Sequence, residues 1–214
     1  MDEEIKIIDS NTRNEKIVNF FINNKKNFII CVSIIIMGSF GYFTFEEINE
    51  RNKIKLADKF NSIKINFKEE VKQKTINELI EIINQKDVTY SPLALYFLLD
   101  NNLIQNNIET NKLFDELING IDLEKEIKNL IIYKKALFNS NFVAENELLK
   151  TLNPIINSES IWKSHALHLL AEYFYSKNED TKAKEFFNQI LLLPNANNEI
   201  KIESQKRINR DLGE

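Results

Sequence analysis

The chain has 214 residues, a formal net charge of −4, four glycines, three prolines and one cysteine. So few glycines and prolines disfavour β-sandwiches and doubly wound α/β folds, which need many turns. The lone cysteine excludes an internal disulfide, and the mildly acidic balance gives no basic footprint for nucleic acid.

An uncharged run near the N-terminus predicts a membrane anchor. It extends over residues 28–45 with the sequence FIICVSIIIMGSFGYFTF. As an α-helix this run spans about 27 Å, close to the roughly 30 Å hydrocarbon core of a bilayer. A buried core helix is the alternative, but a stretch without a polar face is hard to bury in an otherwise amphipathic protein. We therefore expect a transmembrane helix over residues 28–45.

The charges that flank this run predict its orientation. Basic residues are retained on the cytoplasmic side of a membrane, and lysines directly precede the run, whereas glutamates directly follow it. We expect a cytoplasmic tail over residues 1–27 and an extracytoplasmic domain over residues 46–214. In a bacterium this arrangement describes a single-pass inner-membrane protein whose C-terminal domain is periplasmic. The flanking residues are Lys25, Lys26, Glu46, Glu47 and Glu50.

A cleaved signal peptide is the alternative to a permanent anchor. The triplet Ser39-Phe40-Gly41 has the small-x-small pattern of a cleavage site. The uncharged run is longer than the usual signal core of about 7–15 residues, and the region before it is long and mixed in charge. These features favour an uncleaved signal anchor.

Helical periodicity continues from the anchor almost to the end of the chain, and strand-like alternation is absent. Apolar residues repeat at i, i+3, i+4 and i+7 over residues 76–83, which is typical of an amphipathic helix. Ser91 and Pro92 predict a helix start with serine as the cap. Gly120 predicts a helix end, and Pro154 another. Further helices are expected over about 122–137, 148–154, 160–176 and 180–193.

The sequence predicts that these helices are arranged in pairs. The pairs start near Pro92, residues 125–128 and Trp162, a spacing of about 35 residues, which is close to the 34-residue period of tetratricopeptide repeats. A generic helical bundle is the alternative. The spacing favours an all-α fold in which the anchor is followed by a tetratricopeptide-like helical-repeat domain, an α-solenoid.

The last pair is the clearest. Ala171 and Ala183 would let two antiparallel helices approach closely, and Phe174 and Phe187 would fill the space beside them.

No catalytic motif stands out. His165, His168 and Glu172 share one helical face and could in principle hold a metal, but no fourth ligand is near and no HExxH pattern is present. P-loop, GxGxxG, GxSxG and paired CxxC motifs are also absent, and Cys31 lies within the anchor. We expect no enzyme, no cofactor and no metal site.

Aromatic residues are the candidate partner-binding groups. In a helical-repeat domain the first helices of successive pairs line the concave face. Tyrosine joins an apolar ring to a hydroxyl that tolerates water, which suits contact with extended polypeptides. For Trp162 the alternative is packing between neighbouring pairs. The candidates are Tyr96, Tyr133, Trp162, Tyr173 and Tyr175.

The whole layout resembles the ancillary SecYEG translocon subunit family, the YfgM-like proteins. The resemblance is carried by residues 17–21 before 24–26, by 90–94, by 148–152 and by 162–180. It implies an amphipathic element in the tail (Ile17, Phe20, Phe21) and a protein-interaction role beside the Sec translocon.

The partners that this resemblance implies are translocon subunits, periplasmic chaperones and exported polypeptides, with no nucleic acid and no small-molecule substrate. The alternative function is a scaffold or assembly factor of another cell-envelope complex, such as the divisome or outer-membrane assembly.

Overall fold

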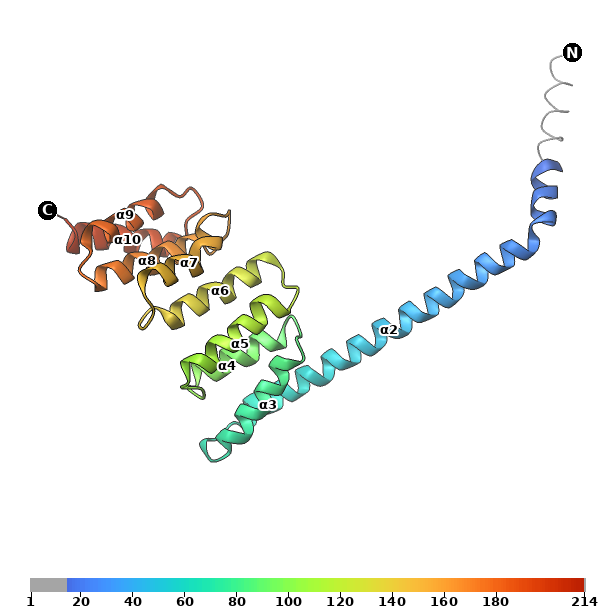
Figure 1. The fold of residues 1–214 in the computed structure, drawn as a ribbon, viewed down its shortest axis with the longest axis horizontal. Coiled ribbons are helices and arrows are strands. Elements are labelled where there is room, and N and C mark those ends of the chain that lie inside the picture. The colour runs from blue at the N-terminus through green and yellow to red at the C-terminus, as the bar shows by residue number, and fades with distance from the viewer. Residues whose placement is uncertain (1–14, 214) are drawn as a thin grey trace, which may run out of the picture. The chain divides into compact units, whose positions relative to one another are not determined.

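The computed structural model describes residues 15–213, which form helices joined by short loops without any strand in that range (Figure 1). The chain divides into two compact units, Met1–Lys55 and Leu56–Glu214. The first half of the expected cytoplasmic tail, residues 1–14, lies outside the described residues. The prediction of an all-α fold is confirmed for the part of the chain that is described.

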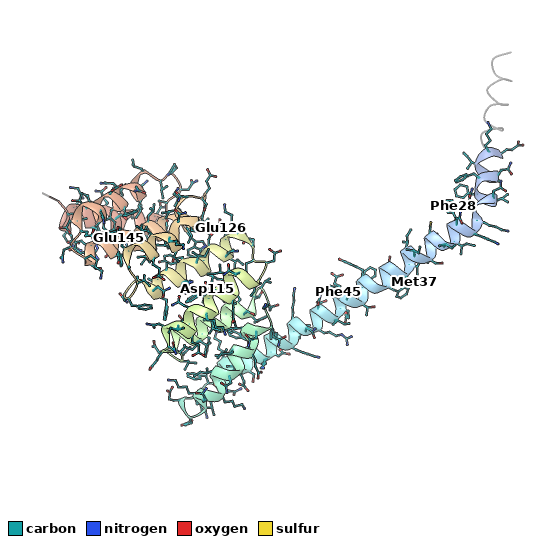
Figure 2. All side chains as sticks on the ribbon, in the orientation of Figure 1. Phe28, Met37, Phe45, Asp115, Glu126 and Glu145 are labelled. Atoms are coloured by element: carbon teal, nitrogen blue, oxygen red, sulfur yellow. The ribbon has the colours of Figure 1, made fainter. Side chains whose placement is uncertain are left out.

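The first unit contains the expected membrane span. Residues 15–23 are helical, a turn follows at Asn24, and helix α2 (Lys25–Asn66) then continues without a break. α2 is long and apolar enough to cross a membrane, and no side chain of its apolar stretch is buried. Figure 2 shows Phe28, Met37 and Phe45 projecting from this stretch.

The hydroxyl groups of this stretch are bonded within the helix itself. Ser39 Oγ donates to the carbonyl oxygen of Ile35, and Thr44 Oγ1 donates to that of Phe40, both at 2.8 Å. These bonds give each hydroxyl proton an acceptor in the preceding turn. A helix in hydrocarbon requires such internal partners, because lipid chains offer no acceptor.

The second unit begins with the last turns of α2 and continues as a series of packed helices. Helices adjacent in the chain pack on one another, with α8 against α9 and α3 against α4 as the most extensive contacts. Contacts also join α6 to α8 and α8 to α10, each two elements apart. The elements are η1 (Glu69–Val71), α3 (Lys72–Asn84), α4 (Tyr90–Asp100), α5 (Asn107–Gly120), α6 (Lys125–Asn139), α7 (Glu145–Ile156), α8 (Lys163–Ser176), α9 (Asp180–Leu192) and α10 (Asn198–Asp211).

Two clusters of buried apolar side chains form the core of this unit. One extends from the end of α2 to α6, and the other from α6 to the chain's last turn. Helix α6 contributes to both, since Ile131 belongs to the first cluster and Ile132 and Ala136 to the second. Helix α6 therefore borders both clusters.

The contact between α8 and α9 has the residues that the sequence predicts for it. Ala171, Ala183 and Phe187 are fully buried, and Phe174 is 1% exposed. Phe174 also stacks on Phe186 with ring centroids 5.5 Å apart. Alanine at these positions lets the helices come close, and the phenylalanines fill the adjoining space.

Polar bonds join α5 to α6. Asn111 and Asn139 exchange two amide hydrogen bonds, of 2.8 and 2.7 Å, and Asn139 is buried. Lys135 Nζ lies 2.7 Å from the carboxylate of Asp115, a residue labelled in Figure 2. The amide pair satisfies groups that would otherwise be costly to bury, so it specifies how these two helices pack.

The start of α4 differs from the sequence prediction. The helix begins at Tyr90, and the cap is provided by Asp87, whose Oδ1 accepts from the backbone N–H of Thr89 at 2.9 Å and of Tyr90 at 2.7 Å. Ser91 is fully buried in the first turn, and its hydroxyl donates to the carbonyl of Ile82 at 3.0 Å. Ser91 therefore connects α4 to α3 and does not cap α4.

The end of α7 also differs from the prediction, whereas α5 ends at Gly120 as expected. Helix α7 passes through Pro154 and ends at Ile156. Proline removes one backbone hydrogen bond and crowds the carbonyl of the preceding turn. The fully buried Ile155 packs in the core from the following position, and this burial favours continuation of the helix past Pro154.

Candidate partner-binding surface

The loop between α7 and α8 is held on α6 by side-chain hydrogen bonds. Ser160 Oγ donates to Glu126 Oε2 at 2.7 Å and accepts from Asn129 Nδ2 at 3.1 Å. The backbone N–H of Ile161 donates to the same Glu126 oxygen at 3.2 Å, and that of Trp162 donates to Ser160 Oγ at 3.1 Å. Glu126, which Figure 2 labels, therefore determines where Ile161 and Trp162 lie.

An aromatic cluster lies beside this loop. The rings of Tyr133 and Trp162 stack with centroids 6.0 Å apart and planes at 19°. His165 approaches both rings, with centroid distances of 5.0 Å to Trp162 and 5.8 Å to Tyr133. Burial lowers the pKa of His165, so its ring is neutral at pH 7. The structure thus brings together Tyr133 and Trp162 of the five predicted residues.

Two hollows lie beside the α7–α8 loop, the smaller of them lined by Trp162 and His165 of the cluster, and we call them together the loop groove. Their volumes are about 270 and 480 Å³, and both are lined by Ile161 and Asn195. Ile161 is 68% exposed. The opposite wall belongs to the α9–α10 loop, where the backbone N–H of Asn197 donates to Ser164 Oγ at 3.3 Å. The remaining lining residues are Ser158, Glu159, Ser160, Trp162, Lys163, His165, Leu193 and Pro194.

The chemistry of the loop groove is mostly neutral. Apolar side chains, amides and hydroxyls form its lining, with Glu159 and Lys163 as its charged residues. Such a mixture offers apolar contact to a side chain and hydrogen bonds to a peptide backbone. The arrangement therefore suits an extended polypeptide better than a small charged molecule.

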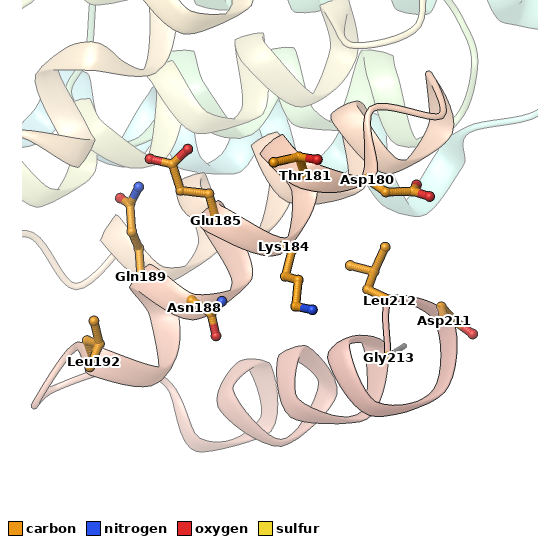
Figure 3. A pocket seen from close by; sticks show the side chains of 10 residues that line it. All are labelled: Asp180, Thr181, Lys184, Glu185, Asn188, Gln189, Leu192, Asp211, Leu212 and Gly213. Atoms are coloured by element: carbon orange, nitrogen blue, oxygen red, sulfur yellow. The ribbon is translucent and has the colours of Figure 1, made fainter.

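A larger hollow of about 840 Å³ lies between α9 and the end of α10 (Figure 3). Its lining is mainly charged and amide side chains, and Leu192 is 81% exposed at one end. Asp211 in this lining is bound by Arg207 and Arg210, whose guanidinium groups hold the pKa of its carboxyl well below the usual range. The aspartate is thus engaged in ion pairs, and we assign no site to this hollow.

Tyr96 and Tyr175 are half-buried and lie outside the loop groove. Lys134 Nζ sits 4.6 Å from the ring centroid of Tyr96, and burial raises the pKa of the Tyr96 hydroxyl, which has no hydrogen-bond partner. The Arg207 guanidinium lies 5.1 Å from the ring centroid of Tyr175. Each ring is therefore covered on one face by a cation.

Tyr173 is a core residue. It is 8% exposed, its hydroxyl donates to the carbonyl of Val143 at 3.3 Å, and its ring lies edge-on to Phe174. The expectation that Tyr173 offers its ring at the surface is wrong, because the side chain is buried where its hydroxyl bonds the α6–α7 loop at Val143.

The polar face of α8 is occupied by α10. Glu172 Oε2 lies 2.8 Å from Arg207 Nη2, whereas the other carboxylate oxygen lies 3.9 Å from His168 Nε2. Within residues 15–213 no group of three or more histidine, cysteine, aspartate or glutamate side chains is placed to hold a metal ion. Glu172 thus serves an ion pair between helices.

Sequence reasoning missed the residues that shape the loop groove. Glu126 reads as part of a solvated acidic cluster, and Ile161 has no periodic signal. The sequence predicts a helix over about 160–176, whereas α8 begins at Lys163, so the periodic pattern gave no sign that Ile161 and Trp162 lie in the loop before it.

No family model, no curated protein and no solved structure matches this chain.

Proposed function

We propose that the protein is a membrane-anchored protein-interaction module that acts as an ancillary subunit of the Sec translocon. In this role it links exported polypeptides to periplasmic chaperones. The observation that carries the proposal is the wholly exposed apolar stretch of α2, joined in one chain to a helical domain whose loop groove is lined in part by Trp162 and His165. The sequence motifs that resemble the translocon subunit family supply the specific assignment.

The proposed location is the bacterial inner membrane, with one uncleaved span and the C-terminal domain in the periplasm. Lysines before the span and glutamates after it support this orientation. An anchor holds the domain close to the translocation pore and raises its effective concentration, so weak contacts with emerging chains suffice.

The proposed architecture of the domain is a tetratricopeptide-like stack. Its support is the packing of consecutive helices together with the contacts of α6 with α8 and of α8 with α10. A helix that contributes to two neighbouring clusters, as α6 does, is also typical of stacked helix pairs.

Copurification from mild detergent tests the assignment to the translocon. We expect the full chain to recover channel subunits of the SecY type. Recovery of divisome or outer-membrane assembly proteins without channel subunits would favour the scaffold function and contradict the translocon role. A chain in which residues 28–45 are replaced by an unrelated apolar span separates contacts of the anchor from contacts of the domain.

Crosslinking to a translocating polypeptide tests the loop groove. Ile161→Asp places a charge in the groove and should remove most of the crosslinking, because the charge disfavours apolar contact. Ile108→Asp is the matched control, since Ile108 is 84% exposed on α5 and lies outside the groove. If Ile161→Asp crosslinks as well as the unaltered chain does, the groove is not the binding surface. If both variants lose crosslinking to the same extent, the loss is a general effect of the added charge.

A further inference from the structure

The helix over residues 15–23 separates apolar from polar side chains. Successive residues of an α-helix are about 100° apart, so the polar residues of this segment fall within about one third of its circumference. The apolar residues occupy the rest, and each is about half exposed. The polar set is Glu15, Lys16, Asn19 and Asn23; the apolar set is Ile17, Val18, Phe20, Phe21 and Ile22.

The segment ends at Asn24, immediately before the membrane span. The Phe20 carbonyl accepts both from the backbone N–H of Asn24 at 3.0 Å and from its Nδ2 at 2.9 Å. The ribbon changes direction here before α2 begins (Figure 1). Across the turn the rings of Phe21 and Phe28 lie with centroids 4.7 Å apart. The apolar face therefore meets α2 at Phe28, the first residue of the apolar run over residues 28–45.

We propose that residues 15–23 form an interfacial helix that lies in the headgroup region of the bilayer that α2 crosses. Its apolar face contacts the acyl chains, and its polar face contacts water. This rests on the membrane anchor of the proposed function but not on the translocon role. An exposed row of large apolar side chains is costly in water, and here it continues directly into an apolar span.

Charge identifies the lipid that fits. Lys16 lies at one border between the two faces and Glu15 at the other, and Lys25 and Lys26 follow at the junction. Residues 15–26 therefore carry three lysines against one glutamate, a net positive charge where the segment meets headgroups. Lysines beside a membrane span attract anionic phospholipids. The occupant of the apolar face is thus a leaflet that contains anionic lipid.

Single cysteines in the full chain test the placement. In a Cys31→Ser background, Ile17→Cys and Phe21→Cys report on the apolar face, and Asn19→Cys and Asn23→Cys on the polar face. Each variant carries an environment-sensitive fluorophore and is placed in nanodiscs of phosphatidylcholine and phosphatidylglycerol, one copy per disc. We expect blue-shifted emission and loss of quenching by a neutral aqueous quencher at the apolar positions alone.

The other outcomes overturn the proposal. Equal quenching at all positions would place the segment in water, and equal protection would place it inside a longer span. Protection that arises only in discs with two copies would assign the apolar face to a second chain. A label on Met37→Cys separates failure of the anchor from failure of the interfacial helix. If the label at this position is quenched, α2 does not cross the membrane.

Discussion

The Ser160 hydroxyl joins the α7–α8 loop to α6, since it bonds Glu126, Asn129 and the backbone of Trp162. Ser160→Ala should lower the free energy of unfolding by about 1–3 kcal/mol, because the buried Asn129 amide and the half-buried Glu126 carboxylate lose this partner. Trp162 is the single tryptophan, so its fluorescence should also shift to the red as the loop loosens.

The matched control is Ser158→Ala in the same loop. The Ser158 hydroxyl donates only to the carbonyl of Ile155, at 3.2 Å. Its loss should cost less and leave the emission of Trp162 unchanged. If both variants behave alike, Ser160 does not determine the position of the loop.

The two histidines should make the domain less stable in mild acid. Burial lowers the pKa of His165, and burial together with the nearby Arg207 lowers that of His168 against the opposing effect of Glu172. Below about pH 6.5 the unfolded chain therefore binds more protons than the folded one. The free energy of unfolding should fall as the pH drops from 7 toward 5.

Urea unfolding of the full chain in detergent at pH 7 and pH 5 measures this effect. The double variant His165→Gln, His168→Gln should show a smaller loss of stability between the two pH values. An identical loss in the variant would assign the acid sensitivity to carboxylates.

At the scale of the elements, asparagine ends helices where glycine usually does. Asn102 and Asn178 follow α4 and α8 with φ of 51° and 59°. In both cases the next backbone N–H reaches back to the helix: Leu103 bonds Leu98 O, and Glu179 bonds Phe174 O, each at 2.9 Å. This is the Schellman arrangement, which favours residues that tolerate the left-handed region.

Substitution of Asn178 tests this role. Asn178→Gly should raise the free energy of unfolding slightly, whereas Asn178→Ala should lower it by about 1 kcal/mol, because a Cβ without a local hydrogen bond disfavours positive φ. Thermal unfolding of the two variants is the measurement. Equal melting temperatures for the two variants would contradict the explanation.

At the scale of the whole molecule, α6 couples the two halves of the core. Ile131 is fully buried in the first cluster, whereas Trp162 packs against the second. Ile131→Ala should lower the free energy of unfolding by about 2–5 kcal/mol through lost burial and a cavity. Both the fluorescence of Trp162 and the far-ultraviolet circular dichroism should report the same loss. An unchanged Trp162 transition would show that the halves unfold independently.

The sequence by itself determined the local features of this protein. Helical periodicity and the uncharged run predicted an all-α chain with one apolar span, because both depend on the order of neighbouring residues. Gly120 and the buried set Ala171, Phe174, Ala183 and Phe187 were predictable for the same reason.

Only the tertiary structure decided which polar and aromatic side chains meet. Asp87 caps α4, whereas the Ser91 hydroxyl donates to the carbonyl of Ile82 in α3. Tyr173 is buried, and its hydroxyl donates to the carbonyl of Val143. The loop groove depends on Glu126 bonding to Ser160, 34 residues away in the chain. A periodic pattern tells which face of a helix is apolar, but a hydrogen bond between distant residues depends on how the helices pack, and that packing is set by the volumes of the whole core.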